Sequence, residues 1–233
     1  LALARQRDLI EPECTIAVDS TGYECRHVSR HYAHRTGQKP YLMRRFAKLS
    51  VAILVRSHLF VSFQITKGPT HDVCEAPEVL RDAHRRVRFA TSLLDMGYDS
   101  ERLLRLIYEE LHATAVVPAR RNYRNPRRWP KTRYRRRMWR SFDVEAYRQR
   151  PQVESVFSRC KRKMGSALSA KTWAGQQREV ALRVLTHNLA VLRRRSSFRQ
   201  SQVITAEGLD EKGRPRNSRK LAKLKRDEGC SLK

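Results

Sequence analysis

Residues 15–22 read TIAVDSTG, an apolar run that stops at an acidic residue and is followed by residues typical of turns. This pattern predicts a buried strand that ends at Asp19. An early hairpin and then alternating helices and strands are expected after it. The predicted strands cover residues 48–56, 59–66, 89–94 and 114–118, and the predicted helices cover 77–88 and 100–112. This order indicates an α/β fold, with a mixed sheet flanked by helices.

The charge of the chain points to a polyanionic partner. The 233 residues include 50 Lys and Arg against 23 Asp and Glu, a formal net charge of +27. Nucleic acid is the commonest partner of such a basic protein. A membrane protein is disfavoured because no apolar run approaches the roughly 20 residues of a spanning helix. With no signal peptide and five scattered cysteines, reduced thiols and a cytoplasmic, nucleoid-associated protein are expected.

Three acidic residues stand at the ends of predicted elements. Asp19 and Asp95 each close an apolar strand, and Glu154 begins an amphipathic helix after Pro151. Carboxylates that meet in a cleft repel one another, and divalent cations with oxygen ligands remove that repulsion. The trio therefore suggests a site for two Mg²⁺ ions, suited to phosphoryl transfer. Each Asp taken alone is more often a helix cap or a turn residue.

The third acid belongs to a spaced signature. Tyr147, Arg150, Glu154 and Lys161 form the pattern Y-x2-R-x3-E-x6-K. Residues seven apart share one helical face, so Glu154 and Lys161 point the same way. Lys161 could then contact a DNA phosphate beside the metals, although a solvent-facing lysine is the simpler alternative. Tyr147 and Arg150 precede the helix, where they could contact phosphate at its positive end.

These blocks resemble the DDE transposases of bacterial insertion sequences, in the branch that carries the Tyr-Arg-Glu-Lys signature. VDSTG at 18–22 and LDMGYD at 94–99 are similar to the family's catalytic-strand sequences, and the likeness covers about residues 15–192. It implies a ribonuclease-H-like fold and gives Asp19, Asp95 and Glu154 the metal-binding roles, with Mn²⁺ able to replace Mg²⁺. It further implies cleavage of double-stranded DNA at the element ends and joining to target DNA. A homodimer is expected to hold the two ends.

Basic side chains supply further candidates for DNA contacts. Residues 120–140 hold eleven Arg or Lys, no acid and several aromatics, a composition that fits phosphates and unstacked bases better than a solubilising loop. Trp129 or Trp139 could stack on a flipped base. A second basic loop follows Cys25, and its three histidines match no paired zinc pattern. The DNA-binding candidates from the two loops are Arg26, Arg30, Arg35, Arg127, Arg128, Trp129, Arg135, Arg136 and Arg137.

The predicted organisation has three parts. Residues 1–13 are a linker or the remnant of a recognition region, 14–193 form the catalytic domain, and 194–233 form a basic, disordered tail. Asp72 precedes a predicted helix, where capping is favoured over a fourth acid near the metals. Two other functions stay open. One is a nuclease of the same fold, such as a resolvase or a ribonuclease, and the other is a non-catalytic, DNA-binding remnant of a transposase.

Overall fold

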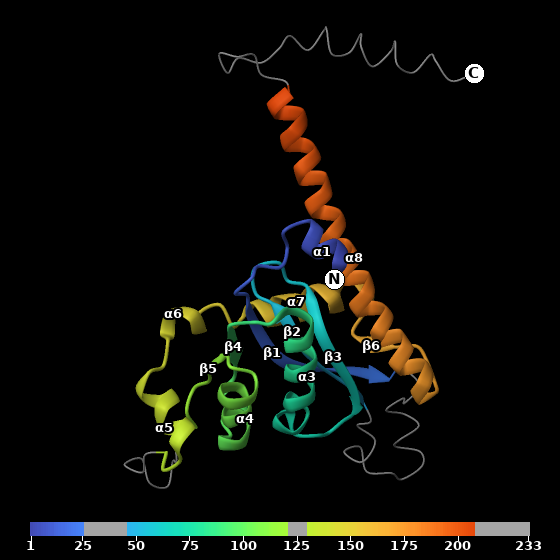
Figure 1. The fold of residues 1–233 in the computed structure, drawn as a ribbon. Helices are drawn as coiled ribbons and strands as arrows, with labels where there is room; N and C mark the ends of the chain where they lie inside the picture. The colour runs from blue at the N-terminus through green and yellow to red at the C-terminus, as the bar shows by residue number, and fades with distance from the viewer. Residues whose placement is uncertain (26–45, 121–129, 208–233) are drawn as a thin grey trace, which may run out of the picture. The chain divides into compact units, whose positions relative to one another are not determined.

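The sheet has six strands in the order β3-β2-β1-β4-β5, with β6 also paired to β1 (Figure 1). The computed structural model describes residues 1–25, 46–120 and 130–207, with side chains described to Arg194. The first three strands are antiparallel, whereas β4, β5 and β6 run parallel to β1 or to each other. The strands are β1 (Thr15–Cys25), β2 (Phe46–Leu54), β3 (Phe60–Lys67), β4 (Thr91–Leu94), β5 (Thr114–Val116) and β6 (Ala167–Leu168).

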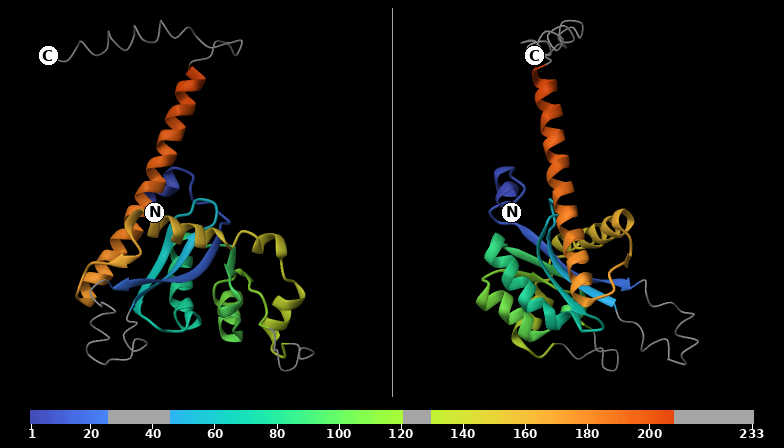
Figure 2. Two further views of the ribbon diagram at one scale, coloured as in Figure 1. Left: turned by 180° about the vertical axis from the view of Figure 1, so that it is seen from behind. Right: turned by 90° about the vertical axis from the view of Figure 1, so that its right-hand side faces the viewer.

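Helices cover both faces of this sheet. Figure 2 shows α3 and α4 on one side of the strands and α7 on the other. The predicted mixed sheet flanked by helices is therefore confirmed. No helix in the described ranges is long and apolar enough to cross a membrane. The helical elements are α1 (Ala2–Gln6), α3 (Asp72–Val87), η1 (Met96–Tyr98), α4 (Glu101–Arg105), η2 (Leu106–Glu110), α5 (Arg133–Arg140), α6 (Val144–Tyr147), α7 (Gln152–Met164) and α8 (Trp173–Glu207).

Two predicted element boundaries are wrong. The first strand was expected to end at Asp19, but β1 continues to Cys25 because its antiparallel pairing with β2 extends to Glu24. The helix expected to begin near Pro77 starts five residues earlier, so Pro77 lies inside α3. Glu75, in the first turn of α3, is held by side chains of the sheet and anchors this earlier start.

The described chain divides into two compact units. The first spans Leu1–Leu189 and includes residues 1–13, of which Ala4 and Leu9 are buried. The second unit, Ala190–Lys233, is described only as far as Glu207. α8 continues to Glu207, so it includes the first residues of the predicted tail. No Gly or Pro interrupts residues 173–207 after Gly175, so the helical backbone has no strong breaker there.

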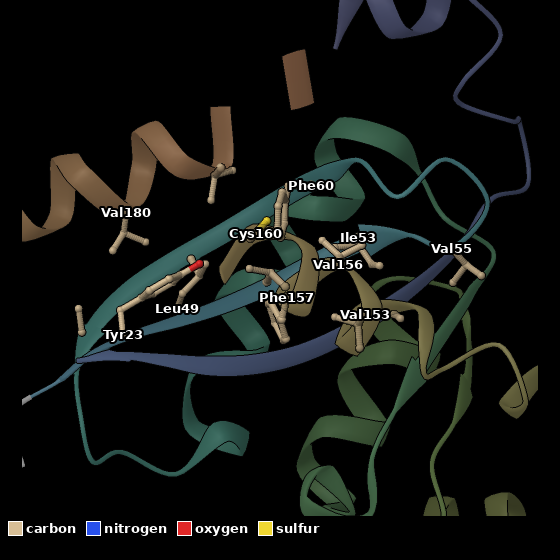
Figure 3. Close-up of a cluster of buried hydrophobic side chains, with 14 of the residues drawn as sticks. Tyr23, Leu49, Ile53, Val55, Phe60, Val153, Val156, Phe157, Cys160 and Val180 are labelled. Atoms are coloured by element: carbon tan, nitrogen blue, oxygen red, sulfur yellow. The ribbon is translucent and has the colours of Figure 1, made fainter. Parts of the chain in front are cut away.

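The core on the α7 side fixes the position of that helix. Val153, Val156, Phe157 and Cys160 of α7 are buried against alternate residues of the strands. Figure 3 shows these side chains between α7 and the sheet. Burial of each such side chain is worth about 1.5–3 kcal/mol, so the helix that carries Glu154 is firmly held against the sheet.

A buried polar network lies on the opposite face, between the sheet and α3. The Lys48 side chain, only 4% exposed, forms ion pairs with Asp72 (2.7 Å) and Glu75 (2.9 Å). Glu75 also accepts hydrogen bonds from the hydroxyls of Ser50, Thr66 and Thr70. Burial alone would raise the pKa of Glu75, but these donors outweigh it, and the pKa is lowered. The network ties the start of α3 to β2.

We expect Glu75→Gln to lower the free energy of unfolding by about 2 kcal/mol at pH 7, because Lys48 and three hydroxyls lose a charged acceptor. Since the pKa of Glu75 is lowered by folding, its contribution is present above the unfolded-state value of 4.5 and is lost at lower pH. Urea unfolding at pH 7 and pH 3 measures both effects. Glu78→Gln, an exposed acid on the same helix, is the control. Equal loss in the two variants would contradict the prediction.

Candidate active site

The register of the central strands brings Asp19 and Asp95 together. Val18 and Leu94 are the last parallel pair between β1 and β4, and each is followed by an aspartate. β4 stops there, as predicted, whereas β1 continues and meets β6 only at Glu24. Residues 19–23 of β1 therefore have no strand partner on this edge within the described part of the chain. We call this opening in the sheet the β1 gap.

Arg150 gathers the three acids at the β1 gap. Its Nη2 donates to Asp19 Oδ2 at 2.9 Å and lies 3.7 Å from Asp95 Oδ2, while Nη1 donates to Glu154 Oε1. The guanidinium is 13% exposed, and the Nε atom is buried without a hydrogen-bond partner. The predicted trio is thus brought together around a cation that comes from its own signature. A contact between Arg150 and DNA phosphate stays a prediction.

Asp19 is the most constrained of the three carboxylates. Burial raises the pKa of Asp19 to about 6, even though Arg150 and a hydrogen bond from the Ser20 amide oppose that rise. A raised carboxyl pKa means that stability is lost as the pH rises from 3.8 through about 6. At neutral pH the ionised group therefore carries a desolvation cost, and additional positive charge beside it would relieve that cost.

The other two signature residues lie near this centre in different ways. Tyr147 is the last residue of α6 and packs on Phe142, with ring centroids 5.3 Å apart. Burial raises the pKa of Tyr147, and the nearby acids add to this rise, although the positive charge of Arg150 opposes it. Lys161 is half-buried, with Nζ 5.6 Å from the ring centroid of Tyr23, and burial lowers its pKa. Tyr23 lies at the far end of the β1 gap. Lys161 thus points to the gap rather than fully into solvent.

Comparison with protein families matches residues 10–189, more than half of the chain, to the family described as Transposase DDE domain. The chain belongs to this family. Comparison with curated protein sequences finds no match.

Solved structures similar to the DDE domain include a piggyBac transposase synaptic complex with hairpin DNA, at a TM-score of 0.53 and 13% identity. That match covers 82% of this chain and 49% of the piggyBac chain, so this chain spans about half of that protein. The catalytic core domain of BIV integrase also matches, with a TM-score of 0.34, 12% identity, and coverage of 66% and 67%. The predicted ribonuclease-H-like fold is confirmed.

The three predicted DNA-binding arginines of α5 have partners within the chain. Arg135 forms two hydrogen bonds with Asp99 (2.8 and 2.6 Å), whose side chain is almost fully buried. Arg136 donates to backbone carbonyls of the preceding turn, and Arg137 stacks on Tyr108 at 4.6 Å. The predicted candidates that lie outside the described residues are Arg26, Arg30, Arg35, Arg127, Arg128 and Trp129. The histidines considered for zinc lie outside them too.

Sequence reasoning missed the contacts that Ser20 and Lys48 make on the other face of the sheet, and for Asp72 it favoured a helix cap over a position near the metals. The cap preferred for Asp72 is wrong, since His71 occupies the N-cap position of α3. Asp72 instead accepts a hydrogen bond from Ser20 Oγ at 2.5 Å and pairs with Lys48. Asp99, the last residue of the LDMGYD block, binds Arg135. A lone lysine inside the apolar run 46–54 was the available signal for a buried ion pair.

The donor set of the DDE domain fits a divalent cation by its chemistry. Asp19, Asp95 and Glu154 offer hard carboxylate oxygens around one positively charged position, and Asp19 carries an uncompensated desolvation cost. Within residues 1–25, 46–120 and 130–207, no three acidic, His or Cys side chains lie in a ready cation cluster. The three carboxylates are spread around the Arg150 guanidinium, which supplies the counter-charge.

We expect Arg150→Gln to lower the free energy of unfolding by about 2 kcal/mol in EDTA. Three carboxylates would lose their shared counter-charge, and the loss falls below that of a fully buried pair because Glu154 is 59% exposed. Unfolding in urea measures the difference in free energy between the two proteins. Urea is used because it is uncharged and, unlike guanidinium chloride, does not screen ion pairs. Arg148→Gln, which removes an exposed pair with Glu145, should cost less than about 0.5 kcal/mol. Arg150→Gln with wild-type stability would show that this contact contributes nothing to folding.

Proposed function

We propose that this chain is the catalytic core of a DNA transposase of the bacterial insertion-sequence type. It would cleave double-stranded DNA at the ends of its element and join the freed ends to target DNA. The observation that carries the proposal is the convergence of Asp19, Asp95 and Glu154 on Arg150, in a chain of the DDE family. The complete Tyr-Arg-Glu-Lys signature supports assignment to the insertion-sequence branch.

The three carboxylates would hold two Mg²⁺ ions, for which Mn²⁺ can substitute. Such ions, when bound, activate the attacking oxygen and stabilise the leaving one. The chain's own part is to keep three acids at one opening and to place positive charge beside them. Arg150 has an unpartnered Nε and is the first candidate for a phosphate contact. Lys161, which lies over the Tyr23 ring, and Tyr147, which shortly precedes Arg150, would position the DNA strand.

The reaction consists of two phosphoryl transfers. In the first, a water oxygen forms a bond to phosphorus at the element end, the P–O3′ bond breaks, and a 3′-hydroxyl is freed. In the second, that 3′-oxygen attacks a phosphodiester of the target, and the target's 3′-oxygen leaves. Both transfers pass through the same arrangement of carboxylates and phosphate, so one centre serves both.

Outside the three-acid site, the proposed DNA contacts are those of positively charged side chains. The basic segment 120–140, including Arg135, Arg136 and Arg137, and the basic residues after Cys25 would bind DNA phosphates. Arg136 and Arg137 are the better candidates of the three, because Arg135 is committed to Asp99. We further propose a homodimer that holds two element ends and acts on DNA of the nucleoid, in the cytoplasm.

A nuclease of the same fold would perform the first transfer only. The buried Asp19 and the Arg150 contact serve hydrolysis as well as joining, so this alternative shares the centre and differs in product. A joining assay separates the two functions.

Glu154→Gln should abolish both cleavage and joining, by at least about a thousandfold, because one cation ligand is lost. The substrate is a supercoiled plasmid that carries the DNA flanking the coding sequence, incubated in Mg²⁺ or Mn²⁺. Primer extension detects cleavage, and PCR across new junctions detects joining. Glu145→Gln, an exposed acid of the same segment, is the matched control and should retain activity. Activity of Glu154→Gln equal to wild type would overturn the proposal, and cleavage without joining by the wild type would favour the nuclease.

Trp139 of α5 is 42% exposed, next to the basic side chains of that helix. If it stacks on an unpaired base, Trp139→Ala should weaken binding of a duplex with an unpaired base about tenfold or more. Trp139→Phe should retain most of the affinity because it keeps an aromatic face. Fluorescence anisotropy measures both variants against a fully paired duplex of the same sequence. An equal loss on the two duplexes would show that the ring does not read an unpaired base.

A further inference from the structure

Asp72 and Tyr98 lie beside the candidate cation site but have no part in the three-acid arrangement. Ser20 connects Asp72 to the centre, because its amide donates to Asp19 Oδ1 at 2.8 Å and its hydroxyl donates to Asp72 Oδ1 at 2.5 Å. Successive residues of a strand point to opposite faces. Asp19 thus faces α7 while Ser20 faces α3, and the β1 gap is where the two faces open to each other.

The contacts of the Asp72 carboxylate are made through one of its two oxygens. Ser20 and Lys48 both bind Oδ1, whereas no hydrogen bond to Oδ2 is found among the described residues. The side chain is 40% exposed, so the second oxygen is accessible. Lys48 is buried and shared with Glu75, and it holds Asp72 in one orientation without enclosing it. An acid that is oriented through one oxygen and open at the other is prepared to bind a cation.

Tyr98 provides an independent observation. Its side chain is 1% exposed, and its hydroxyl has no hydrogen-bond partner in the described structure. A buried hydroxyl without a partner costs about 1–3 kcal/mol. Burial, followed by the carboxylates of Asp72, Asp19 and Asp95, raises the pKa of Tyr98. Tyr98 follows Asp95 in η1, and η1 packs against α3.

We propose that Asp72 is a fourth carboxylate of the cation site, and that the Tyr98 hydroxyl hydrogen-bonds to the water or carboxylate oxygens of the occupied site. This inference rests on the proposed function, because it assumes that Asp19, Asp95 and Glu154 bind divalent cations. It extends the site from the α7 face through the β1 gap to the start of α3. It also gives the buried Lys48 a role, which is to orient Asp72 while Glu75 balances the remaining charge.

Mn²⁺ binding to the full chain tests the proposal without reference to catalysis. The free-ion EPR signal measures affinity for wild type, Asp72→Asn, Tyr98→Phe, Glu154→Gln and the control Asp82→Asn. We expect Asp72→Asn and Tyr98→Phe each to weaken binding about tenfold or more. Asp82→Asn removes the same charge further along α3, where Asp82 pairs with Arg86, and should bind as wild type. Tyr98→Phe changes no charge at neutral pH, so weaker Mn²⁺ binding by this variant cannot come from a change in the protein's electrostatic field.

Thermal unfolding in EDTA separates a site role from a structural one. Tyr98→Phe should unfold at the wild-type temperature or above, because it removes an unpartnered hydroxyl. Asp72→Asn keeps an oxygen for Ser20 and Lys48, and circular dichroism checks that it folds. Wild-type Mn²⁺ affinity in both variants, with weakened binding in Glu154→Gln, would overturn this inference and leave the proposed function standing. Wild-type affinity in Glu154→Gln as well would overturn both.

Discussion

The pairing of β1 is the constraint on which the rest of the site depends. On one edge β1 is paired with β2 over nearly its whole length, and on the other it is paired with β4 only as far as Val18. The continuous edge keeps β1 rigid, and the interrupted edge opens the sheet next to Asp19. A strand that ended at Asp19 would have placed the acid on a mobile turn. A longer β4 would have closed the opening.

Two buried cations balance the acids on the two faces of the sheet. Arg150 faces Asp19, Asp95 and Glu154 from the α7 side, and Lys48 faces Asp72 and Glu75 from the α3 side. Neither group could be buried alone without a large desolvation cost. The two clusters are joined through Ser20, whose amide and hydroxyl bind one acid on each side. A change of charge on one face is therefore felt on the other, which is a reason to treat the two clusters as one electrostatic unit.

The fold and the chemistry come from separate parts of the chain. The α7 core and the β1–β2–β3 ladder form a ribonuclease-H-like framework built mainly from apolar side chains and backbone pairing. The site lies where that framework is interrupted. The first residue after β4 and the turn before α7 contribute to it. The segment between β5 and α7 carries much of the basic charge and is held to the framework by Asp99 and Tyr108.

The sequence by itself predicted the early hairpin and the mixed sheet, because apolar periodicity is a local property. It also singled out the three acids as candidates, because strand ends and the Tyr-Arg-Glu-Lys spacing can be read locally. It could also place Glu154 and Lys161 on one helical face. Only the tertiary structure decided that β1 passes beyond Asp19, since the length of a strand depends on a partner that lies 22 to 30 residues later, from Glu24↔Phe46 to Ser20↔Ser50. It likewise decided that Arg150 lies among the acids and that Asp72 binds Ser20 and Lys48 instead of capping a helix. Those contacts join residues far apart in the chain, and their electrostatic balance exists only once the sheet has brought them together.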